Sequence, residues 1–105
     1  MAKYYLRWQM NPQITITNPE ERAKLIMSLL EMTKQDLQAG KVKDWGTVPG
    51  EASGYAIKEA ASEIDILTDA VKFMPYVNFD VKPVLTVDQT MEAFKKAAAE
   101  AQAKK

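Results

Sequence analysis

Segments with the apolar spacing of a strand and segments with the apolar spacing of a helix follow one another in an order that limits the folds this chain can adopt. Four segments alternate apolar and polar side chains, which is the period-2 pattern of a half-buried β-strand. These segments are residues 4–10, 41–48, 54–60 and 76–85. Between residues 18 and 40, and again between 62 and 75, apolar residues recur at the three- and four-residue spacing of an amphipathic helix. The predicted order is therefore strand, helix, strand, strand, helix, strand.

Capping residues mark the ends of both predicted helices. Asn18 and Pro19 suit the cap and the first helical position of the first helix, and Gly40 supplies its stop. Ser62 is the expected cap of the second helix, which Pro75 ends. The predicted buried stripes are Ile26, Leu29, Leu30, Thr33 and Leu37 in the first helix, and Ile64, Leu67 and Val71 in the second.

This order of elements predicts one α+β domain over residues 1–105, with the ferredoxin-like βαββαβ arrangement. Each helix has a single predicted stripe, so both should cover the same face of a four-stranded antiparallel sheet and leave the other face open. Thr86 or Asp88 is expected to cap an extra C-terminal helix over about residues 88–105. Met91 and Phe94 are its only large apolar anchors, so we expect its end to be frayed unless it docks on a partner chain.

The composition excludes several classes of chemistry. The 105 residues include no cysteine and no histidine, so thiolate and imidazole catalysis are excluded, and neither a metal site nor a cofactor is predicted. Fourteen basic residues balance fourteen acidic ones, which argues against nucleic acid as a partner. No run approaches the roughly 18 apolar residues of a membrane span, so no membrane association is expected and the cytoplasm is the predicted location.

One long stretch resembles muconolactone isomerase and its dimeric α+β-barrel relatives. The stretch is LQAGKVKDWGTVPGEASGYAIKEAASEIDILTDAVKFMPYVNFDVKPVL, residues 37–85. The matching features are Leu37-Gln38-x-Gly40-Lys41 at a helix end, Trp45 in a strand, Pro75-Tyr76 before the last strand and Val81-x-Pro83 near its end. Arg7 looks like an arginine that those isomerases carry in the first strand.

The resemblance implies that two sheets pack open face to open face in a barrel-like homodimer, and that larger rings of dimers can form. It also implies a cavity inside each half or at the interface. Tyr5 stands where the isomerase pattern leads us to expect a histidine. The resemblance therefore predicts a fold and does not carry over the isomerase reaction.

Alternation along the strands places a set of aromatic and hydrogen-bonding residues on the open face. The candidate ligand-binding residues are Tyr5, Arg7, Gln9, Trp45, Tyr55, Asn78 and Asp80. Such a mixture is typical of small-molecule pockets, where Arg7 would grip a carboxylate and the aromatic rings would stack on a planar ligand. The same residue types are enriched at interfaces between proteins, and Arg7 would then pair with Asp80.

Three functions remain open from the sequence. The first is a small-molecule-binding or isomerase-like protein that holds a small anionic or aromatic molecule in a cavity behind Arg7, with the isomerase likeness implied by the resemblance alone. The second is a non-catalytic homo-oligomeric module whose open face is wholly packed by its partner. The third is a cofactor-free monooxygenase-like enzyme, which the resemblance suggests because relatives of the fold oxidise aromatic compounds. No motif names a reaction, so the sequence leaves open whether the protein is an enzyme.

Overall fold

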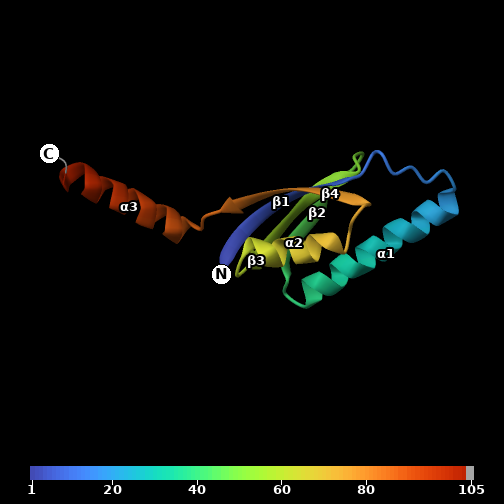
Figure 1. Cartoon of the computed structure of the whole chain (residues 1–105), viewed down its shortest axis with the longest axis horizontal. Coiled ribbons are helices and arrows are strands. Elements are labelled where there is room, and N and C mark those ends of the chain that lie inside the picture. The colour runs from blue at the N-terminus through green and yellow to red at the C-terminus, as the bar shows by residue number, and fades with distance from the viewer. Residues whose placement is uncertain (104–105) are drawn as a thin grey trace.

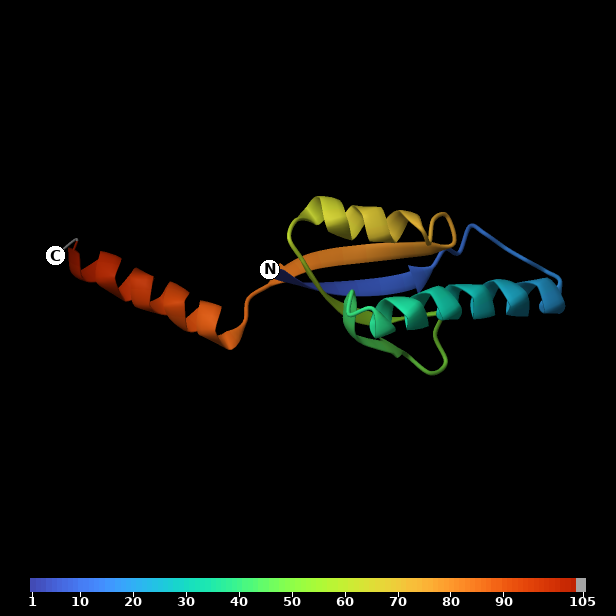
Figure 2. The ribbon, with the colours of Figure 1, turned by 90° about the horizontal axis from the view of Figure 1, so that it is seen from below.

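The computed structural model describes residues 1–103 and confirms the predicted order of elements, with a third helix at the C-terminal end (Figure 1). The strands are β1 (Ala2–Met10), β2 (Val42–Thr47), β3 (Ser53–Ala60) and β4 (Val77–Val84). The helices are α1 (Pro19–Gln38), α2 (Glu63–Val71) and α3 (Val87–Ala103). The strands form one antiparallel sheet in the order β2-β3-β1-β4. Both α1 and α2 cover the same face of that sheet (Figures 1 and 2).

The predicted cap and stop of α1 are both present. Asn18 Oδ1 accepts hydrogen bonds from the backbone N–H groups of Glu20, at 2.9 Å, and Glu21, at 3.3 Å. Gly40 has φ +79°, a left-handed backbone that glycine adopts without a steric penalty. Of the predicted stripe of α1, only Leu29 is buried. The helix is therefore held over the sheet without filling the space beneath it.

The predicted buried stripe of α2 is wrong. Ile66 and Ala70 are its buried residues, whereas Ile64, Leu67 and Val71 are 75%, 58% and 54% exposed. The apolar residues of this short helix form one broad face, so spacing alone did not identify which part of that face is buried. Ala70 is small enough to allow close approach to the sheet, and the residues of the predicted stripe face outward.

The core lies between the helices and the sheet, in two clusters that meet at Phe79. Tyr4 and Leu6 of β1 are 2% and 0% exposed, which confirms that the even-numbered residues of this strand face the helices. The first cluster consists of Tyr4, Leu6, Val42, Ala56, Ala60 and Ile66, and the second of Leu29, Phe73 and Val77.

A β-bulge in β2 changes which side of the sheet its residues face. Val42 is opposite Lys58 of β3, but Asp44 is opposite Ile57, so Lys43 is an extra residue in the ladder. Strict alternation would place Trp45 on the open face. The bulge instead turns Trp45 toward the helices, where it packs against the core, and the prediction for this residue is wrong.

The last helix extends away from the rest of the molecule (Figures 1 and 2). With this helix included, the molecule measures 68 Å along its long axis and 26 and 24 Å across. The predicted Thr86 cap is present as a capping box with Gln89. The Gln89 N–H donates to Thr86 Oγ1 at 3.2 Å, and the Thr86 N–H donates to Gln89 Oε1 at 2.9 Å. The predicted end of this helix, residues 104–105, lies outside the described residues.

Candidate functional site

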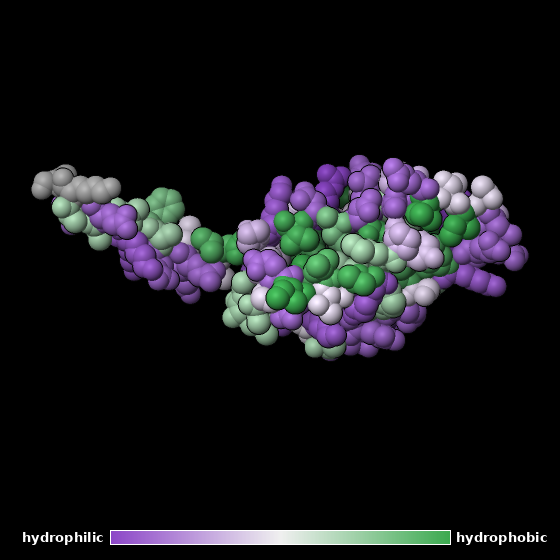
Figure 3. Space-filling model, in the orientation of Figure 1, coloured by the Kyte–Doolittle hydropathy of each residue, from purple (hydrophilic) through white to green (hydrophobic). Residues whose placement is uncertain are grey.

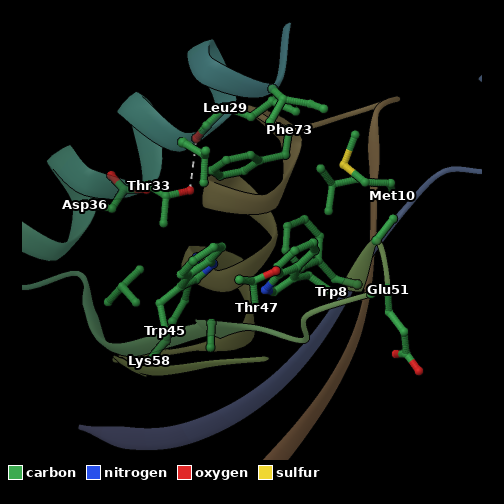
Figure 4. A pocket seen from close by; sticks show the side chains of 18 residues that line it. Trp8, Met10, Leu29, Thr33, Asp36, Trp45, Thr47, Glu51, Lys58 and Phe73 are labelled. Atoms are coloured by element: carbon green, nitrogen blue, oxygen red, sulfur yellow. Dashed lines mark hydrogen bonds between the residues drawn. The ribbon is translucent and has the colours of Figure 1, made fainter. Parts of the chain in front are cut away.

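A pocket of about 690 Å³ lies between α1 and the sheet (Figure 4). Its side chains come from α1, from all four strands, from the β2–β3 turn and from Phe73 after α2. They are Trp8, Met10, Ile26, Leu29, Leu30, Thr33, Asp36, Val42, Trp45, Thr47, Gly50, Glu51, Ala52, Ala56, Lys58, Phe73, Val77 and Phe79. Most are apolar, so the pocket is suited to a hydrophobic molecule.

Two tryptophans form the floor of the pocket on the sheet side. The indole rings of Trp8 and Trp45 are stacked, with centroids 5.3 Å apart and planes 5° from parallel. Trp8 Nε1 donates a hydrogen bond to the carbonyl of Gly46 at 3.2 Å, which satisfies its polar atom and fixes the ring. Gly54 lies opposite Trp8 in the ladder, and a side chain there would meet the indole ring.

Most polar side chains around the pocket already have partners. Thr33 donates to the carbonyl of Leu29 at 3.0 Å (the dashed line in Figure 4). Asp36, only 6% exposed, accepts from Lys72 Nζ at 3.2 Å through one carboxylate oxygen and at 3.4 Å through the other. These bonds fix the orientation of the wall formed by α1.

Lys58 is the exception among the pocket residues. It is 4% exposed and lies on the helix-facing side of β3, in register with Tyr4 and Val42. Burial lowers the pKa of Lys58 below its usual value of 10.5, although the carboxylates of Asp69 and Asp36 act in the opposite direction. Sequence reasoning missed this residue. The available signal was a lysine at the same period as the inward-facing Ala56 and Ala60.

The open face holds six of the seven predicted site residues. In the ladder Arg7 lies opposite Tyr55 on one side and Asp80 on the other, and Gln9 lies opposite Asn78. Tyr5 shares this face at 37% exposure. Trp45 is the seventh residue, and it lies on the opposite side of the sheet, in the α1 pocket.

The predicted Arg7–Asp80 ion pair is not among the contacts of the described residues. Asp80 instead lies 3.8 Å from Lys82 Nζ on its own strand. Nearby, Tyr55 donates a hydrogen bond to Asp44 Oδ2 at 2.9 Å, and this bond raises the pKa of Tyr55. The bulge that turns Trp45 inward is the same feature that brings Asp44 to this face.

The fold and the pocket define a ferredoxin-like α+β protein with a helix-covered apolar pocket. The pattern of DUF3303, a domain of unknown function, matches residues 2–98, so the chain belongs to the DUF3303 family. A search of curated proteins finds no match. Among solved structures, the chain is similar to muconolactone isomerase, with a TM-score of 0.62 and 15% sequence identity. That similarity covers 80% of this chain and 88% of the isomerase, and it confirms the fold that the sequence resemblance implied.

Proposed function

We propose that this protein binds a small, largely apolar molecule in the pocket between α1 and the sheet. The observation that carries the proposal is a space of about 690 Å³ with the stacked pair Trp8 and Trp45 on one side and Leu29 of α1 on the other. Small-molecule sites have volumes of roughly 300–1,000 Å³, with apolar walls and a few polar groups. This proposal places the site in the pocket and not on the open face. Of the seven site residues that the sequence predicted, only Trp45 lines the pocket.

Two threonines in equivalent helical settings provide a matched test. Thr33 lines the pocket, and Thr68 on α2 lies outside it. Each donates its hydroxyl to the carbonyl four residues earlier, Thr33 at 3.0 Å and Thr68 at 2.8 Å. Replacing either by phenylalanine therefore removes the same kind of bond, but only Thr33→Phe fills the pocket.

The measurement is a titration with an amphipathic anionic fluorescent probe such as anilinonaphthalene sulfonate, followed by competition with a library of uncharged and anionic aromatic compounds. Quenching of Trp8 and Trp45 provides a second signal from within the site. We expect Thr33→Phe to weaken binding at least tenfold and Thr68→Phe to leave it unchanged. Equal binding by both variants, or no compound bound by the unaltered protein, would overturn the proposal.

A second proposal is that the chain assembles with copies of itself through α3. Val87, Met91 and Phe94 form a stripe at helical spacing and are 73%, 52% and 73% exposed. Exposed apolar side chains of α3 and of the body over α2 are visible on the face shown in Figure 3. Within residues 1–103, α3 does not pack closely on any other helix or strand (Figure 2). Packing of this stripe on a partner would therefore stabilise the helix.

The surface proposed to receive α3 is the edge of α2 that lies beside β4 in another copy. A groove of about 610 Å³ lies between α2 and β4, lined in part by Leu67, Met74 and Pro83. Leu67 and Met74 are 58% and 55% exposed, so a matching apolar surface is available. The open sheet face remains the alternative contact, as in the barrel-like dimer that the sequence resemblance implies.

Light scattering at micromolar concentration distinguishes these contacts. We expect the full chain to be an oligomer, Phe94→Glu to be a monomer, and Lys96→Glu on the polar side of α3 to remain an oligomer. Dissociation by Tyr5→Asp instead of Phe94→Glu would place the contact on the open face. A full chain that is monomeric would contradict self-assembly by either surface.

A further inference from the structure

Lys58 occupies a position that is costly for a lysine. Its side chain lies under the helices in the middle of the sheet, on β3 between Tyr4 of β1 and Val42 of β2, and only 4% of its surface is exposed. Lysine is almost never buried to this extent unless its ammonium group is paired. Lys58 also lines the apolar pocket, so its side chain borders the space proposed for a ligand.

The neighbouring carboxylates are already engaged by other lysines. Asp36 is bonded to Lys72 Nζ at 3.2 Å. Asp69 lies 3.7 Å from the same ammonium and 4.0 Å from that of Lys41. Within residues 1–103, no carboxylate lies within 4.0 Å of Lys58 Nζ and no hydrogen bond from it is present. The nitrogen is not fully enclosed, because no buried side-chain nitrogen or oxygen in these residues lacks a partner, and its accessible surface borders the pocket. Lys58 therefore has unused hydrogen-bonding capacity beside the pocket.

The charged groups around Lys58 carry a net positive charge. The charged groups that act on Lys58 are the carboxylates of Asp36 and Asp69 and the ammonium groups of Lys41 and Lys72. With Lys58 protonated, three positive charges face two negative ones, which leaves one positive charge in excess. A single negative charge entering the pocket would balance this group and would be attracted strongly because apolar walls screen charge poorly.

We infer that the ligand of this pocket is an amphipathic monoanion, a carboxylate whose head group binds Lys58 Nζ and whose apolar body lies against Trp8 and Trp45. This inference rests on the proposed binding function and specifies the chemical class of the ligand. A charge-assisted hydrogen bond inside an apolar pocket satisfies the ammonium group and gives the ligand one orientation. The lowered pKa of Lys58 agrees with an ammonium group that lacks a close anion.

A pair of compounds that differ only in charge tests the inference. Naphthaleneacetate and its primary amide have nearly the same shape, and both would quench the two tryptophans. We expect the unaltered protein to bind the carboxylate at least tenfold more tightly than the amide. This size corresponds to about one charge-assisted hydrogen bond.

Variants assign that preference to a residue. Lys58→Met keeps the length and apolar stem of the side chain, and we expect it to bind both compounds with the affinity the unaltered protein shows for the amide. Lys82→Met removes a lysine that lies on β4 and is 69% exposed, and it should retain the full preference. Circular dichroism confirms that each variant is folded.

The outcomes distinguish the inference of an anionic ligand from the proposed binding function. Tight binding of the amide, equal to that of the carboxylate, would overturn the role of Lys58 and leave the pocket as an apolar binding site. A preference for the carboxylate that survives in Lys58→Met would place the anion elsewhere and also overturn the inference. Failure of the unaltered protein to bind any of these aromatic compounds, charged or uncharged, would overturn the proposed function itself.

Discussion

Trp8 of β1 and Trp45 of β2 stack across the strand that separates them, with ring centroids 5.3 Å apart. The rings meet over β3 because Gly54 lies opposite Trp8 and presents no side chain. On the other side of the sheet the ring of Tyr55 covers Gly46 in the same way. Aromatic residues thus cover a glycine on each face of the β2–β3 hairpin, an arrangement that compensates for weak strand packing at glycine.

The first prediction concerns the close contact at Gly54. A methyl group added there would lie 2.6 Å from Cζ2 of Trp8 and against the carbonyl oxygen of Gly46, so the ring or the strand must move. Gly54→Ala should lower the free energy of unfolding by about 1–3 kcal/mol, as overpacking of a core does. Urea denaturation measures this loss, and near-UV circular dichroism should show a changed tryptophan signal.

Gly46→Ala is the control for that change. Its added methyl group would collide with the ring of Tyr55 on the open face. We expect a similar loss of stability but a change mainly in tyrosine absorption, since the Tyr55–Asp44 hydrogen bond would be displaced. An unchanged tryptophan signal in Gly54→Ala would contradict the packing of Trp8 over β3.

The second prediction is that Lys58→Met stabilises the protein in the absence of ligand. Burial lowers the pKa of Lys58, so between that lowered pKa and 10.5 the unfolded chain binds more protons than the folded protein. The free energy of unfolding of the unaltered protein therefore rises with pH through this window, and the full penalty is present below it. Removing the charge should raise stability at pH 7 on the order of 1 kcal/mol, the lower end for replacing buried ionic groups with apolar ones.

Thermal unfolding measured at several pH values tests both parts of this statement. The advantage of Lys58→Met over the unaltered protein should shrink as the pH approaches 10.5. Lys82→Met is the matched control, because that lysine is exposed and its loss should have little effect at any pH. A variant less stable than the unaltered protein at pH 7 would show that Lys58 stabilises the fold.

The third prediction concerns Asp36, in the last turn of α1. A negative charge is unfavourable at the C-terminal end of a helix, and Lys72 compensates for it at 3.2 Å. Asp36→Asn should cost about 1–2 kcal/mol, less than a fully buried pair because the Lys72 side chain is 39% exposed. It should also lower the pKa of Lys58 further, because one of the carboxylates that raises that pKa is lost.

Asp69→Asn is the comparison for Asp36→Asn, which breaks the ion pair with Lys72. Asp69 is more exposed, and its contacts with Lys72 and Lys41 are longer, at 3.7 and 4.0 Å. Its substitution should therefore cost less stability in chemical denaturation. An equal cost for the two variants would mean that the buried position of Asp36 contributes nothing beyond surface electrostatics.

The sequence predicted the elements of the fold because their signals are local. Asn18 and Gly40 mark the ends of α1 through caps that depend only on adjacent residues. The faces of β1 and β4 follow from strict alternation, which the ladder preserves between Arg7 and Asp80. Local rules fail where the outcome depends on packing, as in α2, where only one edge of a broad apolar face is buried against the sheet.

The site could not be predicted in the same way. The pocket exists because α1 is held over the sheet with only Leu29 and Asp36 buried, and this spacing is a tertiary property. Lys58 was recognisable only as a charged residue on the inward side of a strand. The side faced by Trp45 depends on the bulge at Lys43, and no residue in that segment signals a bulge by its type.

The last prediction tests that bulge directly. Deleting Lys43 would restore regular alternation, because Asp44 would follow Val42 on the open side and Trp45 would still face the helices. The Lys43 side chain makes a surface ion pair with Glu59 at 3.9 Å, which contributes roughly 0–1 kcal/mol. The deletion should therefore leave the protein folded, with the near-UV signal of stacked Trp8 and Trp45 retained. Deleting Ile57 from the regular β3 ladder is the contrasting variant, since it would turn Lys58 to the open face and should unfold the protein. A lost tryptophan signal in the Lys43 deletion would show that the extra residue is needed to aim Trp45 into the pocket.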